Sequence, residues 1–202
     1  MKVHIPSFKH AKWLKRANWL GVVTAILMIV LIFLGGWWRV NVGGGAAAVS
    51  VSPFSINTTM LGDQVSIPIV WYITLGVKLL VLAAGIALLV GSLAVDKWWS
   101  KRLIRFGATK ILWMVVFFLV SITLMTLVMN KFLAGTSPEL EGFNMPYVSG
   151  STVSTLELEE DATATIPISL ALTKAFAVAV AVAILGVATR IYQRRLSPPI
   201  KH

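Results

Sequence analysis

The chain of 202 residues contains no cysteine. Disulfides, thiolate metal sites and thiol nucleophiles are therefore excluded, even for segments exposed to an oxidising compartment. Charged residues are also scarce, at 13% of the sequence, whereas a soluble domain carries about 25%. Only eight residues are acidic. This composition argues against a water-soluble protein.

Apolar residues make up 57% of the chain, and they gather in four blocks at about 18–37, 69–95, 108–130 and 168–189. A bilayer core of about 30 Å is crossed by about 20 apolar residues in a helix. We therefore expect an all-α membrane protein with one domain, 1–202, built as a bundle of four transmembrane helices. The first block is longer than the apolar part of a secretory signal, which predicts a retained anchor.

Basic residues are distributed unevenly between the connecting segments. Five precede the first span, five lie in or next to the 96–107 connection, and four follow the last span. The loops 38–68 and 131–167 contain only Arg39 and Lys131. The positive-inside rule then predicts cytoplasmic termini, a cytoplasmic 96–107 loop and two external loops in a multi-pass protein of the cell membrane. The net charge of +10 is explained by topology and anionic lipid, so the lipid bilayer is an expected partner and nucleic acid is not.

The two halves, 1–95 and 96–202, follow the same order of basic segment, span, external loop and span. The tripeptide Ile-Pro-Ile occurs at 67–69 and again at 166–168, before the second and fourth predicted spans. Proline suits the first turn of a helix, because its missing N–H would be unpaired there. Internal duplication and independent use of proline as a helix start both explain the pattern.

Both external loops contain strand-like sequence. Residues 49–52 alternate valine and serine, and 153–158 are rich in β-branched residues, with turn residues at 43–45, 61–64 and 149–150. These patterns predict a small extracellular β-sheet formed by the two outer loops. Two independent flexible loops are the alternative.

The four spans, the strands in both loops and the exit from the first span through Trp37-Trp38-Arg39-Val40 resemble the claudin-like tetraspan membrane proteins. The resemblance implies an architecture only, since the paired loop cysteines of that family do not occur here.

Two lysines, Lys78 and Lys174, fall inside predicted spans. Ionisable groups within a membrane are candidates for function. Each lysine could also extend its ammonium outward to the headgroups. The functional alternative is a lysine pair that faces the bundle interior and binds an anionic group or a partner's carboxylate.

Small residues recur every four positions in two spans, a spacing that lets helices approach closely in lipid. The predicted packing residues are Ala83, Ala87, Gly91, Ala175, Ala179 and Ala183, and Ala177 and Ala181 form a second stripe. The third span, with Trp113, Phe117 and Phe118, is predicted to face lipid.

No catalytic set, cofactor motif or metal-binding motif occurs in the sequence. Asn57 begins an Asn-Thr-Thr acceptor sequence for N-glycosylation. The acidic cluster at 157–161 has oxygen ligands of the kind that Ca²⁺ binds, but its spacing matches no recognised loop, and a solvated strand end or turn is the favoured explanation.

We therefore expect no enzyme. The leading hypothesis is a scaffold or accessory subunit that recognises other membrane subunits, or itself, through its external loops and small-residue faces. The alternative is a transporter or channel component that uses Lys78 and Lys174 for an anionic substrate.

Overall fold

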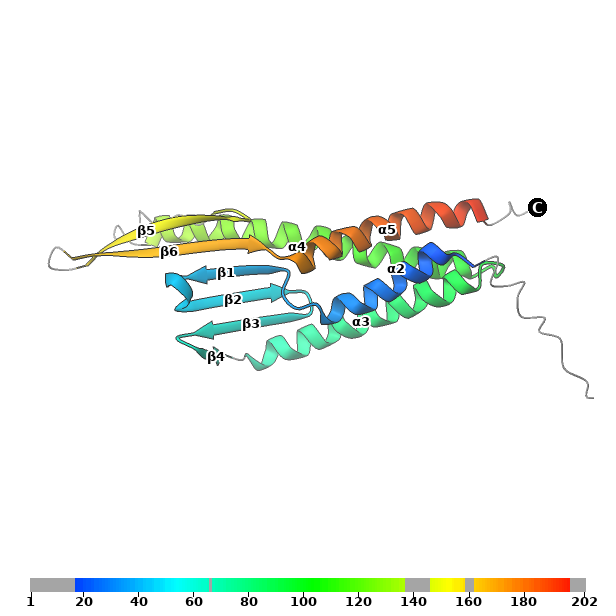
Figure 1. Ribbon diagram of the computed structural model, residues 1–202, viewed down its shortest axis with the longest axis horizontal. Coiled ribbons are helices and arrows are strands. Elements are labelled where there is room, and N and C mark those ends of the chain that lie inside the picture. The colour runs from blue at the N-terminus through cyan, green and yellow to red at the C-terminus, as the bar shows by residue number, and fades with distance from the viewer. Residues whose placement is uncertain (1–16, 66, 137–145, 159–161, 197–202) are drawn as a thin grey trace, which may run out of the picture.

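The molecule is elongated, with a helical bundle at one end and a β-sheet at the other (Figure 1). The computed structural model describes residues 17–65, 67–136, 146–158 and 162–196. The N-terminal end of α2 (Trp19–Val30), the connection from α3 (Pro68–Leu93) to α4 (Ser100–Thr136) and the C-terminal end of α5 (Lys174–Leu196) lie together at the end of the bundle away from the sheet. We call this the basal end.

The bundle has four helical segments. Helix α2 (Trp19–Val30) continues into the 3-10 turn η1 (Leu31–Phe33), and α3 (Pro68–Leu93), α4 (Ser100–Thr136) and α5 (Lys174–Leu196) follow. The last three are long and apolar enough to cross a membrane, whereas α2 is a shorter apolar helix. Helices α2 and α4 each pack against both α3 and α5, which places α3 and α5 diagonally across the bundle.

The first helix ends earlier than predicted. The expected span reached residue 37, but regular helix stops at Val30 and η1 at Phe33. Gly35 then adopts a φ of 81°, a left-handed conformation that favours glycine and ends a helix. The chain turns there, so Trp37 and Trp38 enter the sheet region instead of marking the end of a span.

The fourth helix begins later than predicted. The expected span began at Ile168, but residues 162–172 form strand β6 and the helix starts at Lys174. Only Pro68 of the two Ile-Pro-Ile prolines lies in the first turn of a helix. Pro167 is paired with Val153 of β5 but lies beyond the end of the β1 ladder, which begins at Ile168. Proline is found in sheets at such positions, where one side of the strand is not paired.

Helix α4 is longer than predicted at both ends. Its 37 residues correspond to about 55 Å, well beyond a hydrocarbon core of about 30 Å. The predicted 96–107 loop is therefore largely helix, and only 94–99 connects α3 to α4. Lys101, Arg102 and Arg105 are presented from a helix and not from a flexible loop.

One antiparallel sheet contains six strands in the order β4-β3-β2-β1-β6-β5. The strands are β1 (Trp38–Val42), β2 (Ala47–Ser52), β3 (Ser55–Met60), β4 (Asp63–Val65), β5 (Gly150–Leu158) and β6 (Ala162–Leu172). The first loop supplies β1–β4 and the second supplies β5 and β6. The prediction of a single sheet built from both loops is confirmed, and flexible loops are excluded for these residues.

Trp37 joins the sheet to the bundle. It is fully buried, and its ring meets Phe54, Phe118 and Phe176 with centroid separations of 5.7, 5.1 and 5.9 Å. Its backbone N–H donates to Val51 at 2.8 Å. The third span is therefore not simply lipid-facing, because Phe118 enters this core while Phe117 remains 72% exposed.

Candidate functional site

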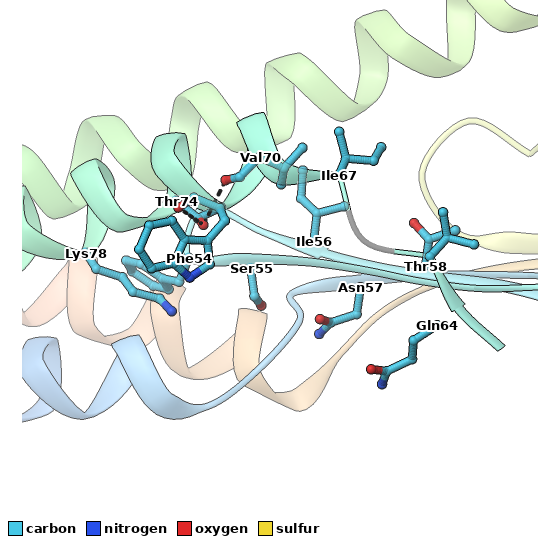
Figure 2. Close-up of a pocket in the computed structure, with 12 residues that line it drawn as sticks. Phe54, Ser55, Ile56, Asn57, Thr58, Gln64, Ile67, Val70, Thr74 and Lys78 are labelled. Carbon is cyan, nitrogen blue, oxygen red and sulfur yellow. Dashed lines mark hydrogen bonds between the residues drawn. The ribbon is translucent and has the colours of Figure 1, made fainter.

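A pocket of about 270 Å³ lies where the edge of the sheet meets helix α3 (Figure 2). Strands β3 and β4 form one side, and the first turns of α3 form the other. Its lining residues are Phe54, Ser55, Ile56, Asn57, Thr58, Gln64, Val65, Ile67, Val70, Trp71, Thr74 and Lys78. Polar and apolar groups thus meet in one concave surface, as in sites that bind organic ligands or partner side chains.

Four of the polar side chains that line this pocket point to one side of it. In Figure 2 the side chains of Ser55, Asn57 and Gln64 and the amine of Lys78 project toward one side, and Ile67 and Val70 lie on the other. Alternation along β3 explains part of this separation, because Ser55 and Asn57 share a strand face. The arrangement suits an occupant with one polar end and one apolar end.

Lys78 is the single charged group of this pocket, and it is half-buried on α3. Thr74, one turn earlier, donates its hydroxyl to the carbonyl oxygens of Val70 and Trp71 at 2.9 and 3.0 Å. That hydroxyl is therefore occupied within its own helix, as is common in apolar helices. The ammonium of Lys78 and the amides of Asn57 and Gln64 are left as donors to a bound acceptor.

None of the residues that line the pocket is Asp, Glu or His. No hydroxyl there is paired with a general base, which nucleophilic catalysis needs. No group of three or more His, Cys, Asp or Glu residues gathers within the part of the chain that the structure describes. The chemistry that this pocket supports is binding of an anionic or hydrogen-bonding group.

The structure does not bring the two predicted lysines together. Lys174 is exposed and begins α5, next to Thr173, whose hydroxyl donates to the Gly36 carbonyl at 2.7 Å. Lys78 belongs to α3, which lies diagonally across the bundle from α5. The bundle interior between them is filled by apolar side chains such as Val81 and Ala179. A lysine pair that faces one interior path is therefore not formed.

The small residues of α5 face the bundle. Ala179 and Ala183 are buried and Ala175 is half-buried, whereas Ala177 and Ala181 are exposed. In α3, Gly91 is buried against α4, where an added Cβ would lie 3.0 Å from Ile104 Cγ1.

Ala87, in contrast, is half-buried and Ala83 is exposed. The inner face of α3 is instead formed by Ala84, Gly85 and Leu88. Ala83 thus lies on the outer surface, where only a partner or lipid could contact it.

Asn57 lies in the middle of β3 opposite Ser50, and its side chain is exposed. It is a wall of the pocket as well as the start of the predicted glycosylation sequence. The acidic cluster falls largely outside the described residues, since 159–161 are not described.

A second hollow, of about 590 Å³, runs along the outer surface between α3 and α4 below the sheet. Apolar side chains such as Val77, Leu80, Trp113 and Phe117 line it. It shares Ile56 and Thr74 with the pocket between the β3–β4 edge and α3, which we call the Lys78 pocket. The apolar side of that pocket is therefore continuous with a surface suited to lipid chains.

Sequence patterns did not reveal a buried polar cluster at the basal end. Asn18, Thr24, Ser92, Ser100, Thr189 and Gln193 are all at most 2% exposed. Asn18 donates to Gln193 Oε1 at 3.0 Å, and Thr24 Oγ1 and Thr189 Oγ1 lie 3.1 Å apart. Ser100 donates to the Gly91 carbonyl at 2.7 Å. The cluster, which we call the basal clasp, takes residues from all four helices.

No protein-family model and no curated protein matches the chain. Function is therefore inferred from the residues and their arrangement.

Proposed function

We propose that this protein is a non-enzymatic membrane protein with four spans that acts as an accessory subunit or scaffold and holds another membrane subunit at its sheet end. Helix α2 and η1 contain 12 and 3 residues, about 22 Å of helix. A short span of this kind is accommodated by local thinning of the bilayer. Burial of Ala25, Met28 and Leu31 against its neighbours supports its place in the bundle.

We place the basal end in the cytoplasm and the sheet outside the cell. Support comes from the basic residues, because those of the 94–105 segment and of α5 beyond residue 189 belong to the basal end. Lys and Arg accumulate on the cytoplasmic side of membrane proteins. Trp71 and Tyr72, both exposed near the start of α3, suit the opposite headgroup layer.

The observation that carries the proposal is an apolar surface on the β3–β4 hairpin. Leu61, in the turn of this hairpin, is 87% exposed and adopts a φ of 52°, a conformation that costs energy for a leucine. Met60 and Val65 are exposed beside it. We call these three residues the hairpin face.

Met60 and Leu61 lie at the end of the hairpin face away from the start of α3, whereas Val65 lines the pocket beside α3. The turn that joins β3 to β4 is at the end of the sheet away from the bundle (Figure 1). Exposed apolar clusters in such positions are typical of protein–protein interfaces.

The Lys78 pocket continues this surface toward the membrane, because Val65 belongs to both. A partner that covers the hairpin face can place a carboxylate against the Lys78 ammonium. An ion pair shielded from water in this way favours one orientation of the partner and rejects subunits without the acidic group.

The experiment that tests this proposal is crosslinking in intact membranes with tagged variants of the full chain. Leu61→Asp should reduce recovery of the crosslinked subunit at least tenfold, since a charge would be buried at the interface. Val153→Asp is the matched control, because Val153 is also an exposed apolar residue of the sheet but lies on β5, at the edge opposite β4. Equal recovery with both variants would contradict the role of the hairpin face.

Lys78→Gln and Lys174→Gln separate the scaffold from the alternative of a transporter. A scaffold that uses the pocket loses partner recovery with the first substitution and keeps it with the second. A carrier that uses both lysines loses anion flux in proteoliposomes with either substitution, and that result would replace the scaffold proposal.

A further inference from the structure

A third hollow, which does not involve the sheet, lies at the basal end between α4 and α5. Its volume is about 180 Å³, and its lining residues are Lys101, Ile104, Arg105, Arg190, Gln193 and Arg194. Four of these six side chains are cationic. The floor is formed by Ile104 and Gln193, which are 1% and 2% exposed.

Helix packing explains why the pocket forms there. Helices α5 and α4 lie close together at Gly186, where an added Cβ would be in van der Waals contact, 3.5 Å from both the Cα and the carbonyl oxygen of Ala108. One turn further toward the basal end, Arg190 on α5 and Arg105 on α4 replace these small residues. The pocket lies between these larger side chains.

The charges of this pocket are not balanced by the helices that carry them. Neither α4 nor α5 contains Asp or Glu. Lys101 and Arg105 are four residues apart, as are Arg190 and Arg194, and like charges at this spacing repel each other. Four cations around one hollow create a positive potential that favours an anion.

Membrane topology alone does not require four basic side chains to line one hollow. The positive-inside rule needs basic residues near the ends of spans but does not specify which way they face. Arg102 and Arg195 satisfy the same rule from neighbouring positions and do not line the pocket. Three of the four basic residues in the pocket are arginines. The planar guanidinium of arginine binds phosphate oxygens in a bidentate geometry, so these residues favour a phosphate.

We propose that this pocket binds the phosphate of an anionic lipid headgroup. The helices that form it are long and apolar enough to cross a membrane, so their basal ends reach the headgroup layer. Basic pockets between transmembrane helices at this level bind acidic headgroups. Arg105 and Arg190 contact the phosphate from opposite walls, and Lys101 and Arg194 complete the rim.

A bound headgroup would tie α4 to α5 next to the basal clasp. The Gln193 side-chain amide in the pocket floor donates to Ser100 Oγ at 3.3 Å and accepts from Asn18. The lipid therefore stabilises the same helix ends that the clasp connects. This inference requires a membrane location but not the partner proposed for the sheet end.

The test is a titration of the full-length chain in a neutral detergent with dioctanoyl phosphatidylglycerol. The zwitterionic dioctanoyl phosphatidylcholine and inorganic phosphate are titrated in parallel. We expect preference for phosphatidylglycerol over both. The double variant Arg105→Gln/Arg190→Gln should bind phosphatidylglycerol about 30-fold more weakly, the loss expected for two basic side chains near an anionic surface.

The matched control is Arg102→Gln/Arg195→Gln, which removes the same charge from the same two helices outside the pocket. It should bind as the unmodified chain does. Equal weakening in both variants would show nonspecific attraction and overturn the proposal. Inorganic phosphate that binds as tightly as the lipid would identify a soluble anion and overturn the assignment to lipid. If Arg105→Gln/Arg190→Gln does not fold, Lys101→Gln/Arg194→Gln on the exposed rim makes the same comparison.

Discussion

The side-chain amide of Asn18 donates a 3.0 Å hydrogen bond to the side-chain carbonyl of Gln193, joining residues 175 positions apart in sequence. The same Asn18 caps helix α2, because its Oδ1 accepts from the Gly21 N–H at 3.0 Å. One side chain thus starts the first helix and connects it to the last. The basal clasp therefore fixes the helix ends in the region where the chain enters and leaves the bundle.

Gln193→Ala should destabilise the bundle by about 1–2 kcal/mol, because it removes the hydrogen bonds that Gln193 makes with the buried side chains of Asn18 and Ser100. Urea unfolding in a mild detergent, followed by circular dichroism, measures the change. Gln64→Ala removes an exposed amide from the sheet and should change stability by less than about 0.5 kcal/mol. Similar losses for the two variants would contradict the importance of the clasp.

Gly21→Ala should destabilise the protein by about 1–3 kcal/mol through overpacking. A Cβ at this position overlaps the Ser92 hydroxyl and lies 2.9 Å from Thr189 Cγ2. The double variant Gly21→Ala/Ser92→Gly removes the main overlap and should recover part of the loss. Gly76→Ala is the control on α3, since nothing lies within 4 Å of its added Cβ. Thermal unfolding of the four proteins shows whether close approach at Gly21 limits stability.

The sequence predicted the number of apolar segments and the single sheet because both depend on local patterns. Hydropathy identifies a span, and alternation identifies a half-buried strand. The basal clasp has no such pattern. Asn18, Thr189 and Gln193 stand near the ends of apolar runs, where polar residues are ordinary, and only the folded bundle brings them together.

A predicted helix boundary was wrong where one residue suits both a helix and a strand. Pro167 fits the first turn of a helix as well as a strand position beyond the end of one ladder, and the second applies here, because Pro167 pairs with Val153 of β5 but with no residue of β1. Repetition every four residues was also insufficient to define the inner face of α3. Ala83 and Ala84 are adjacent, and only Ala84 is buried, because the neighbouring helices determine which stripe turns inward.

Ala179→Leu and Ala177→Leu form a matched pair on α5. Ala179 is fully buried and Ala177 is exposed. The first substitution should destabilise the monomer by about 1–3 kcal/mol, since a closely packed interface has no room for three added carbons. The second should leave unfolding unchanged. A loss with Ala177→Leu that appears only at high protein concentration would instead indicate contact with a second copy.

Trp37→Ala should cost about 3–5 kcal/mol, the usual loss for a large aromatic side chain in a core. The sheet should loosen before the helices, because Trp37 contacts Phe54 from the sheet side and Phe118 and Phe176 from the bundle. Hydrogen exchange resolved by segment separates these two events. Trp98→Ala, at a residue 75% exposed, is the control, and uniform exchange across both parts would contradict a linking role for Trp37.

Because the chain contains no cysteine, single cysteines report its orientation without background. Ala46→Cys and Ser149→Cys place exposed thiols on the two loops that build the sheet, and Lys97→Cys places one at the basal end. A membrane-impermeant maleimide added to intact cells should label the first two variants, and Lys97→Cys only after lysis, since basic segments remain in the cytoplasm. Labelling of Lys97→Cys in intact cells would reverse the orientation, whereas labelling of only one sheet variant would contradict a shared external sheet.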